Sequence, residues 1–353
     1  MKPSSRPAVL LRVLLPILCA GLTGTLTLRA QNFYVGNYIG GTGSVEEFNA
    51  GSTTPLFTIT SGIDNPSVNS VALGGNTLFV GNQTNNTITA YNATSGGNPL
   101  LTISSGVSGP NGMFVSGNVL YVANDGNNTV TEYNATTGSL LLTISSGISY
   151  PNQMALSGNN LYVANGGANT ITEYNATTGG SATMTISSGL SNPTGLLLSG
   201  NTLYAGNIGN GTVTEYNATT GAQGITISTG SQPVDMAISG NNLYVANAVS
   251  NTVTEYNATS GGSALLTISS NISNPQAIFL SGGNIFVANG NNNTITEENA
   301  TTGALVNTFS SGVNHPFSLI PAPEPNTAAL MIVASGLLVF TRFSRRRGCR
   351  RPA

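Results

Sequence analysis

The sequence contains neither lysine nor arginine between Asn32 and Ile320, and it contains no tryptophan anywhere. All ten basic residues lie in the terminal segments, four before this stretch and six after it. The stretch itself carries eleven of the twelve acidic residues, so its formal charge is −11. Nucleic-acid binding by this body is excluded, because neutralising phosphates requires cations. Arginine-dependent phosphoryl transfer is disfavoured for the same reason.

Cysteine and histidine are also nearly absent. The two cysteines, Cys19 and Cys349, lie in the terminal segments, so the body can hold neither a disulfide nor a cysteine-ligated metal. His315 is the single histidine and cannot supply the clustered ligands of a transition-metal site. We expect it in a turn before Pro316. No Gly-x-Ser-x-Gly nucleophile elbow is present, and helix breakers recur too often for helical periodicity.

The body is instead built from an internal repeat. The segment Leu-Tyr-Val-Ala-Asn begins at Leu120, Leu161 and Leu243, and degenerate copies begin at Phe33, Leu78, Leu203 and Ile285. The asparagine that closes each copy recurs at 37, 82, 124, 165, 207, 247 and 289. The spacings are 45, 42, 41, 42, 40 and 42 residues, and propeller blades repeat every ~40–45 residues.

Each unit contains four short pieces rich in β-branched and aromatic residues and bounded by Gly, Asn, Ser and Pro. In the third unit we expect strands over 120–124, 129–133, 140–144 and 153–156. The body opens at 33–37 without the strand that precedes this segment elsewhere, and it ends at 316–320 with a match to the missing strand. The sequence therefore predicts an all-β, seven-bladed propeller of four-stranded antiparallel blades over residues 32–320, with its first blade closed by the C-terminal strand. A parallel β-helix is the alternative.

The units resemble the NHL- and YVTN-type propeller repeats. The resemblance rests on the Leu-Tyr-Val-Ala-Asn segment and on Pro-x-x-Met-Ala-Leu-Ser-Gly, which begins at Pro151. It extends over nearly the whole body. Related propellers include lactonase-like hydrolases with an axial metal and a lyase, so the resemblance implies the fold more strongly than any one function.

Residues 1–30 have the organisation of a secretory signal peptide. Basic residues at positions 2, 6 and 12 precede an apolar run beginning at Val13, and we place the cleavage near Ala30. An uncleaved membrane anchor is the alternative. Export through a secretion translocon follows from the first interpretation.

Residues 321–353 resemble a PEP-CTERM sorting signal. Pro323, Glu324 and Pro325 precede an apolar stretch at 327–341 and an arginine cluster at 342–351. As a helix the apolar stretch spans ~22 Å, short of the ~30 Å hydrocarbon core unless flanking arginines extend it. The resemblance implies transient anchoring in the inner membrane, an exosortase-type sorting enzyme as partner, and a final place in the cell envelope or extracellular matrix. A permanent single-span anchor is the alternative.

The repeated strand-end asparagines are expected to cap loops, because an Asn side chain bonds nearby backbone amides. A ring of amides facing a ligand is the alternative. The turns Asn-Ala-Thr recur at 92, 134, 175, 217, 257 and 299, and we expect hairpins with a positive-φ glycine, although each also matches a glycosylation sequon.

A second recurrence is acidic, at Glu47, Glu132, Glu173, Glu215, Glu255 and Glu297. No cation in the body can pair with these side chains, and buried unpaired carboxylates are costly. We therefore expect most of them to be exposed at a blade edge or hydrogen-bonded to Thr and Asn. Cation binding, with Ca²⁺ as the ion, is the alternative. Asp64 and Asp125 are expected in loops.

Asp235 stands apart from the other acids. It follows Pro233 where other units carry Gly112, Gln153, Gly195, Ala277 or Ser318. In the families that the repeats resemble, this element begins the innermost strand, which implies that Asp235 faces the axis near the channel mouth. Asn69, Asn111 and Asn152 occupy nearby positions and complete the candidate ligand-binding set. Asp235 is interpreted either as part of an ordinary polar lining or as a site that holds a water molecule or a weakly bound cation.

We expect a non-enzymatic scaffold of the cell surface or exopolysaccharide layer that binds a protein or a polysaccharide without a cofactor. Its amide and hydroxyl side chains suit carbohydrate, although few aromatic residues are positioned to stack on sugars. The alternatives are a metal-dependent lactonase-like hydrolase or lyase with a site on the axis, and a Ca²⁺-stabilised scaffold.

Overall fold

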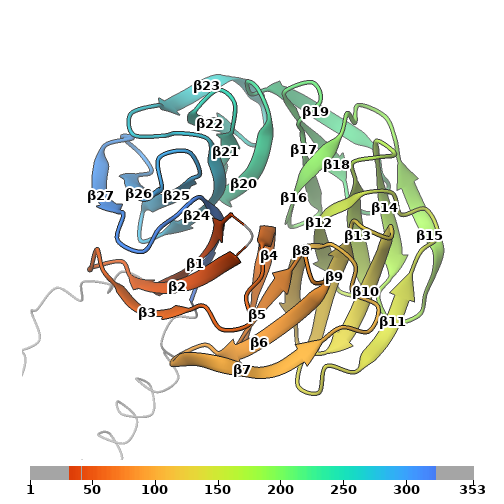
Figure 1. Cartoon of the computed structure of the whole chain (residues 1–353). Helices are drawn as coiled ribbons and strands as arrows, with labels where there is room; N and C mark the ends of the chain where they lie inside the picture. Colours follow the sequence, from red (N-terminus) through yellow and green to blue (C-terminus); the bar gives the residue numbers. More distant parts are fainter. Residues whose placement is uncertain (1–31, 41, 323–353) are drawn as a thin grey trace, which may run out of the picture. The chain divides into compact units, whose positions relative to one another are not determined.

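The computed structural model describes residues 32–40 and 42–322, which form seven four-stranded antiparallel sheets arranged as the blades of a propeller (Figure 1). The predicted fold class is therefore confirmed. No helix in this part of the chain is long and apolar enough to cross a membrane. The predicted signal peptide and the sorting signal, with Pro323, Glu324 and Pro325, lie outside the described residues.

From the axis outward, the strands of the blades are as follows. Blade 1 comprises β28 (Pro316–Pro321), β1 (Asn32–Ile39), β2 (Thr42–Asn49) and β3 (Pro55–Ile59); blade 2 comprises β4 (Pro66–Gly74), β5 (Thr77–Asn82), β6 (Thr87–Asn92) and β7 (Gly96–Ile103); blade 3 comprises β8 (Pro110–Ser116), β9 (Val119–Asn124), β10 (Thr129–Asn134) and β11 (Leu140–Ile144). Blade 4 comprises β12 (Pro151–Ser157), β13 (Asn160–Asn165), β14 (Thr170–Asn175) and β15 (Gly179–Ile186); blade 5 comprises β16 (Pro193–Ser199), β17 (Thr202–Asn207), β18 (Thr212–Asn217) and β19 (Gln223–Ser228). Blade 6 comprises β20 (Pro233–Ser239), β21 (Asn242–Asn247), β22 (Thr252–Asn257) and β23 (Gly261–Ile268); blade 7 comprises β24 (Pro275–Ser281), β25 (Asn284–Asn289), β26 (Thr294–Asn299) and β27 (Leu305–Phe309).

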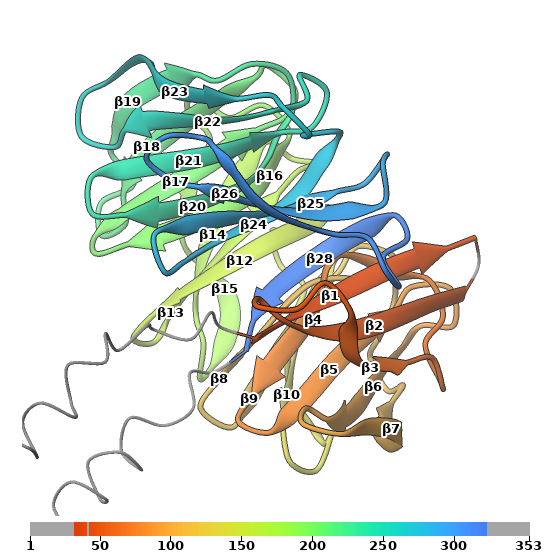
Figure 2. The same ribbon diagram turned by 90° about the vertical axis from the view of Figure 1, so that its left-hand side faces the viewer.

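The first and last strands close the ring together. Strand β28 pairs antiparallel with β1, with Val35 opposite Leu319 and Gly36 opposite Ser318. Figure 2 shows the blue C-terminal strand lying alongside the red N-terminal strand. The predicted closing strand is thus confirmed. The closure gives blade 1 the same four strands as the other blades and covers the inner edge of β1, which would otherwise be unpaired.

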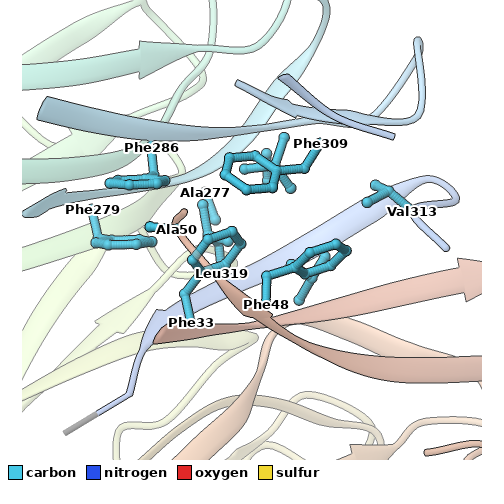
Figure 3. Close-up of a cluster of buried hydrophobic side chains, with 12 residues drawn as sticks. Phe33, Phe48, Ala50, Ala277, Phe279, Phe286, Phe309, Val313 and Leu319 are labelled. Atoms are coloured by element: carbon cyan, nitrogen blue, oxygen red, sulfur yellow. The ribbon is translucent and has the colours of Figure 1, made fainter. Parts of the chain in front are cut away.

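A cluster of phenylalanines packs the seam between blades 1 and 7 (Figure 3). The ring of Phe33 lies 5.1 Å from that of Phe309, 5.3 Å from Phe286 and 5.5 Å from Phe48, measured between centroids. Phe279 stacks on Phe286 at 4.6 Å. Burying each such ring stabilises the fold by ~2–3 kcal/mol relative to exposure. The seam is therefore held by apolar packing as well as by the β1–β28 ladder.

The seven strand-end asparagines are fully buried and bind the connections between blades. In blade 4, Asn165 accepts a hydrogen bond at Oδ1 from the Ser149 amide at 3.1 Å, and its Nδ2 donates to Thr172 Oγ1 at 2.9 Å. Equivalent Oδ1 bonds occur at Asn37, Asn82, Asn124, Asn207 and Asn289. Because all seven side chains are 0% exposed, the capping interpretation is confirmed and the ring of ligand-facing amides is wrong.

A second set of asparagines joins blades 2, 3, 4, 6 and 7 to the blade that follows each of them. These residues sit at positive φ in the loop after the strand-end Asn, and their Oδ1 atoms accept the amide N–H that precedes the next blade's inner-strand proline. The donor–acceptor distances are 2.5–2.8 Å for Asn86, Asn128, Asn169, Asn251 and Asn293. Asn tolerates this left-handed conformation better than other non-glycine residues. Much of the amide content of the sequence is thus structural.

The Asn-Ala-Thr turns also form as predicted. Asn134 Oδ1 accepts hydrogen bonds from the amides of Thr136 and Thr137, and Gly138 has a φ of 70°. The side-chain oxygen thus replaces a backbone acceptor, and the glycine supplies a conformation that a side chain would strain. The turn geometry therefore accounts for the Asn and the Gly of the motif without glycosylation.

Candidate functional site

The inner strands surround a cavity of about 230 Å³ that includes Asp235. Each inner strand begins with a proline whose Cα pairs with the strand-end Asn, and the register shifts directly after it, as between Pro233 and Asp235. The residues that follow this shift line the cavity. Polar lining comes from Asn69, Gln153 and Asp235, and apolar lining from Val71, Met113, Phe114, Met154, Leu196, Leu197, Met236 and Ile320.

Asp235 is held by a chain of hydrogen bonds that crosses four blades. Its Oδ1 accepts from Gln153 Nε2 at 3.0 Å, and its Oδ2 accepts from the Ile278 amide at 2.8 Å. Gln153 Oε1 in turn accepts from the Leu196 amide at 2.7 Å. Blade 5 carries Gly195 at the equivalent position, where a Cβ would lie 3.1 Å from the Val234 carbonyl oxygen. The close approach of these strands requires glycine there.

This environment raises the pKa of the Asp235 carboxyl to about 6. Burial within the ring destabilises the charged form and is the largest cause. Hydrogen bonds from the Ile278 amide, the Gln153 side chain and the Met236 amide lower the pKa and offset part of this effect. Asp235 is therefore charged at neutral pH, and the donors around it already satisfy both of its oxygens.

The other predicted site residues divide into two groups. Asn69 lines the same cavity as Asp235 and has a φ of 58°. Asn111 and Asn152 instead form a ladder between neighbouring inner strands, in which Asn111 Nδ2 donates to Asn152 Oδ1 at 3.1 Å. Asn152 Nδ2 then donates to the Pro193 carbonyl at 3.3 Å. The structure thus brings Asp235 and Asn69 to one cavity and uses Asn111 and Asn152 to join blades.

Gln153 is the polar side chain of the cavity that was not among the predicted site residues. The signal for it was available, because it is the only other long polar side chain at the repeat position of Asp235. We expect Gln153→Leu to raise the pKa of Asp235 above its present value, since a hydrogen bond to the charged form is lost. A carbon-detected NMR titration of the Asp235 carboxyl measures this. An unchanged or lowered pKa would show that Gln153 does not stabilise the carboxylate.

The repeated glutamates meet the prediction in part, because two are half-exposed and two are hydrogen-bonded to asparagines, whereas the exposure expected for the others is wrong. Glu47, Glu132, Glu255 and Glu297 are buried, and only Glu173 and Glu215 are half-exposed. In each blade this residue pairs across the strands with an aromatic residue, as Glu132 does with Tyr121, or Ala90 with Phe79 in blade 2. Glu47 and Glu297 accept hydrogen bonds from Asn32 and Asn284, whereas Glu132 Oε1 has no partner among the described residues. Burial raises the pKa of Glu132 to about 7, so the uncharged form is populated closer to neutral pH than for an exposed glutamate.

The donor chemistry of the cavity does not suit Ca²⁺. That ion takes ~6–8 oxygen ligands, whereas this cavity offers one carboxylate that already accepts two N–H bonds, together with amide, thioether and aliphatic groups. Nor do the residues at 32–40 and 42–322 contain a cluster of three or more His, Cys, Asp or Glu side chains able to hold a metal ion. The Asp235 carboxylate is thus a hydrogen-bonded member of the inner ring.

The family is decided by a match to the repeat model PQQ_2, described as outer membrane protein assembly factor BamB. It matches residues 41–179 and 98–309, which together cover most of the propeller and more than half of the chain. The chain belongs to this family. The match agrees with the propeller repeats seen in the sequence and in the structure. No curated protein matches the sequence.

Solved structures similar to this BamB-family chain share its fold at low identity. A candidate 6-phosphogluconolactonase from Bacteroides fragilis is 17% identical with a TM-score of 0.69, covering 85% of this chain and 99% of that one. A functionally unknown protein from Desulfotomaculum acetoxidans is 15% identical with a TM-score of 0.68, covering 83% and 99%. BamB from Moraxella catarrhalis is 13% identical with a TM-score of 0.55, covering 80% and 91%. These likenesses show the fold.

Proposed function

We propose that this BamB-family protein is a non-enzymatic interaction scaffold of the cell envelope. The observation that carries the proposal is the state of Asp235, whose two oxygens accept hydrogen bonds from Gln153 and Ile278. No other titratable side chain lines the cavity, among the residues that the structure describes. General acid–base catalysis needs a group free to exchange a proton with a substrate. The similarity to an outer membrane assembly factor also supports a role in binding rather than in turnover.

A lactonase-like hydrolase is the second candidate, because one similar structure is described as a candidate 6-phosphogluconolactonase. The substrate in that name carries a phosphate, and phosphate binding in proteins relies on cationic side chains. Residues 32–320 contain no lysine or arginine. The charge of the body therefore favours the scaffold.

The two candidates are separated by an assay for turnover and metal content on the full chain. We expect no hydrolysis above buffer for 6-phosphogluconolactone or uncharged lactones, and less than about 0.1 equivalent of Ca²⁺ after dialysis. The matched variant is Asp235→Asn, which keeps the size of the side chain. Lactone hydrolysis, or stoichiometric Ca²⁺, that disappears in Asp235→Asn would overturn the scaffold.

We further propose that the scaffold is exported and sorted to the outer surface or extracellular matrix. The basic and apolar residues before Gln31 support export through the translocon, and Pro323, Glu324 and Pro325 with the following apolar and arginine segments support an exosortase-type partner and transient membrane anchoring. We also propose that the repeats are of the NHL type. Neither proposal requires a cofactor or a nucleic-acid partner.

A further inference from the structure

Blade 1 departs from the repeat at three positions on the face where the strand-end asparagines lie. The residue after the strand-end Asn is Tyr38 in blade 1, and elsewhere it is Gln83, Asp125, Gly166, Ile208, Ala248 or Gly290. The residue after the inner-strand proline is Phe317 in blade 1, and elsewhere it is Ser67, Asn111, Asn152, Thr194, Val234 or Gln276. The residue before that proline is His315, which is Tyr150 in blade 4 and is not aromatic in the other blades.

Ring closure brings these three aromatic side chains into contact. Tyr38 comes from the end of β1, whereas His315 and Phe317 flank Pro316 at the start of β28. The ring centroids are 5.9 Å apart for Tyr38 and Phe317, 6.1 Å for Tyr38 and His315, and 4.6 Å for His315 and Phe317. The Tyr38 amide donates to the His315 carbonyl at 3.2 Å, which fixes the two segments together. All three side chains are half-buried, so part of each ring faces solvent.

Tyr38 separates two cavities on this face. The larger, about 590 Å³, is lined by Tyr38, His315 and three asparagines, Asn291, Asn293 and Asn314. The smaller, about 250 Å³, is lined by Tyr38, Phe317, Asn65, Pro66, Ser67 and Gln83. The aromatic side chains thus form a shared wall between two hollows rimmed by amides.

Several of these amides have hydrogen-bonding capacity to spare. Asn293 Oδ1 accepts from the His315 amide and Asn291 Oδ1 accepts from Asn274, but the Nδ2 atoms of both are without a partner in the described part of the chain. The exposed side chain of Asn314 forms no hydrogen bond through Oδ1 or Nδ2 within the described part of the chain. His315 Nδ1 donates to the Gly290 carbonyl at 2.5 Å, and Nε2 has no partner in the described part of the chain. Unlike the strand-end asparagines, these groups are not consumed by the fold.

We propose that Tyr38, His315, Phe317 and the surrounding amides form a binding site for a neutral saccharide. The negative face of an aromatic ring attracts the C–H groups of a sugar, while amide groups both donate to and accept from its hydroxyls. The absence of lysine and arginine from the body disfavours an anionic ligand. The inference rests on the proposed scaffold function, because it names the ligand class that the scaffold binds.

A protein partner fits this site less well than a saccharide. Protein interfaces centre on a desolvated anchor surrounded by contacts that exclude water. Here the lining of the larger hollow includes three asparagines, and the side-chain groups without a partner in the described part of the chain are amides around its rim. Amides that both donate and accept suit the dense hydroxyls of a saccharide better than the apolar anchor of a protein.

The test is binding of the full chain to an array of neutral and acidic oligosaccharides, followed by titration with the strongest neutral probe. Isothermal titration calorimetry measures the affinity, because its signal does not depend on any one tyrosine. We expect Tyr38→Ala to weaken binding by at least ~10-fold, as expected for a central anchor. Asn314→Ala should weaken it by ~3-fold or more, and Tyr38→Phe should retain binding within ~3-fold because the ring remains.

The matched control is Tyr150→Ala, which removes an exposed tyrosine from the blade 4 position that corresponds to His315. It should bind like the original chain, and thermal unfolding should show Tyr38→Ala folded. The saccharide site would be overturned if the chain preferred acidic glycans or bound no neutral oligosaccharide on the array. It would also be overturned if Tyr150→Ala lost as much affinity as Tyr38→Ala. Capture of a protein through Tyr38 would also overturn it while leaving the scaffold function intact, whereas lactone turnover dependent on Asp235 would overturn the function itself.

Discussion

Raising the pH from about 4.5 to 9 is expected to destabilise the propeller by ~5 kcal/mol or more. The cause is a set of carboxyl groups buried without cations. Glu46 is 2% exposed and accepts hydrogen bonds from Ser44 and Asn37, and burial raises its pKa to about 8. Glu298 is 1% exposed, neither of its oxygens has a partner in the described part of the chain, and burial raises its pKa to about 7.

Glu298 replaces a tyrosine of the repeat. In five blades the equivalent hydroxyl donates to a loop carbonyl of the preceding blade, as Tyr133 does to Ser105 at 2.7 Å. The pairing of Glu298 with Ile285 matches that of Tyr133 with Leu120. A neutral carboxyl can donate a hydrogen bond as the tyrosine does, whereas a carboxylate cannot. The protonated state is therefore the one compatible with this position.

The direction of the effect follows from proton linkage. These groups have pKa values near 4.5 when unfolded and about 7–8 when folded, so the folded state binds more protons across this interval. Stability is therefore complete below about pH 4.5, falls as the pH rises toward 8, and levels off above that value. A group whose pKa rises from 4.5 to about 7 removes ~3 kcal/mol over this range.

Thermal unfolding from pH 4 to 9 at constant ionic strength measures the effect. The midpoint should fall by ~10 °C or more between pH 5 and pH 9. Glu298→Gln should raise the midpoint at pH 9 and leave it nearly unchanged at pH 4.5. Asp64→Asn, which neutralises a loop acid, is the charge control and should not flatten the profile. A midpoint that rises from pH 5 to 9 would contradict the buried-acid account.

Removing one strand-end asparagine is expected to be the most damaging single substitution. Asn165→Ala leaves the Ser149 amide and the Thr172 hydroxyl without their buried partner and opens a cavity. We expect a loss of about 3 kcal/mol or more in the free energy of unfolding. Urea unfolding followed by circular dichroism provides the measurement.

Two variants separate hydrogen bonding from volume. Asn165→Leu keeps the number of side-chain atoms but cannot form these bonds, so it should be destabilised as well. Asn159→Ala removes an exposed acceptor of Thr177 and should change stability by no more than ~0.5 kcal/mol. If Asn165→Leu were as stable as the original chain, packing rather than hydrogen bonding would account for the repeated residue.

The fold could be predicted because the repeat encodes it many times over. The spacing of the strand-end asparagines gave the blade number, and the match of 316–320 to a missing inner strand gave the closure. The exposure of the glutamates could not be predicted in the same way. A strand position such as Glu132 has no visible cation, which suggests a solvated carboxylate, but the fold buries this side chain opposite Tyr121 and thereby raises its pKa to about 7.

The sequence predicted part of the Asp235 site and none of the aromatic site. Asp235 was visible as a single departure from a repeat position, but its engagement by Gln153, 82 residues away, depends on the curvature of the ring. The cluster of Tyr38, His315 and Phe317 was not among the predicted site residues. Tyr38 and Phe317 are distant in sequence and meet only because β28 closes onto β1.

The most direct test of the account is a crystal structure of the full chain with the neutral oligosaccharide selected on the array. We predict a sugar ring against Tyr38, with its hydroxyls bonded to Asn314 and its neighbours, and an unchanged contact between Asp235 and Gln153. A sugar lodged in the central cavity with the Asp235 carboxylate released from Gln153 would contradict it.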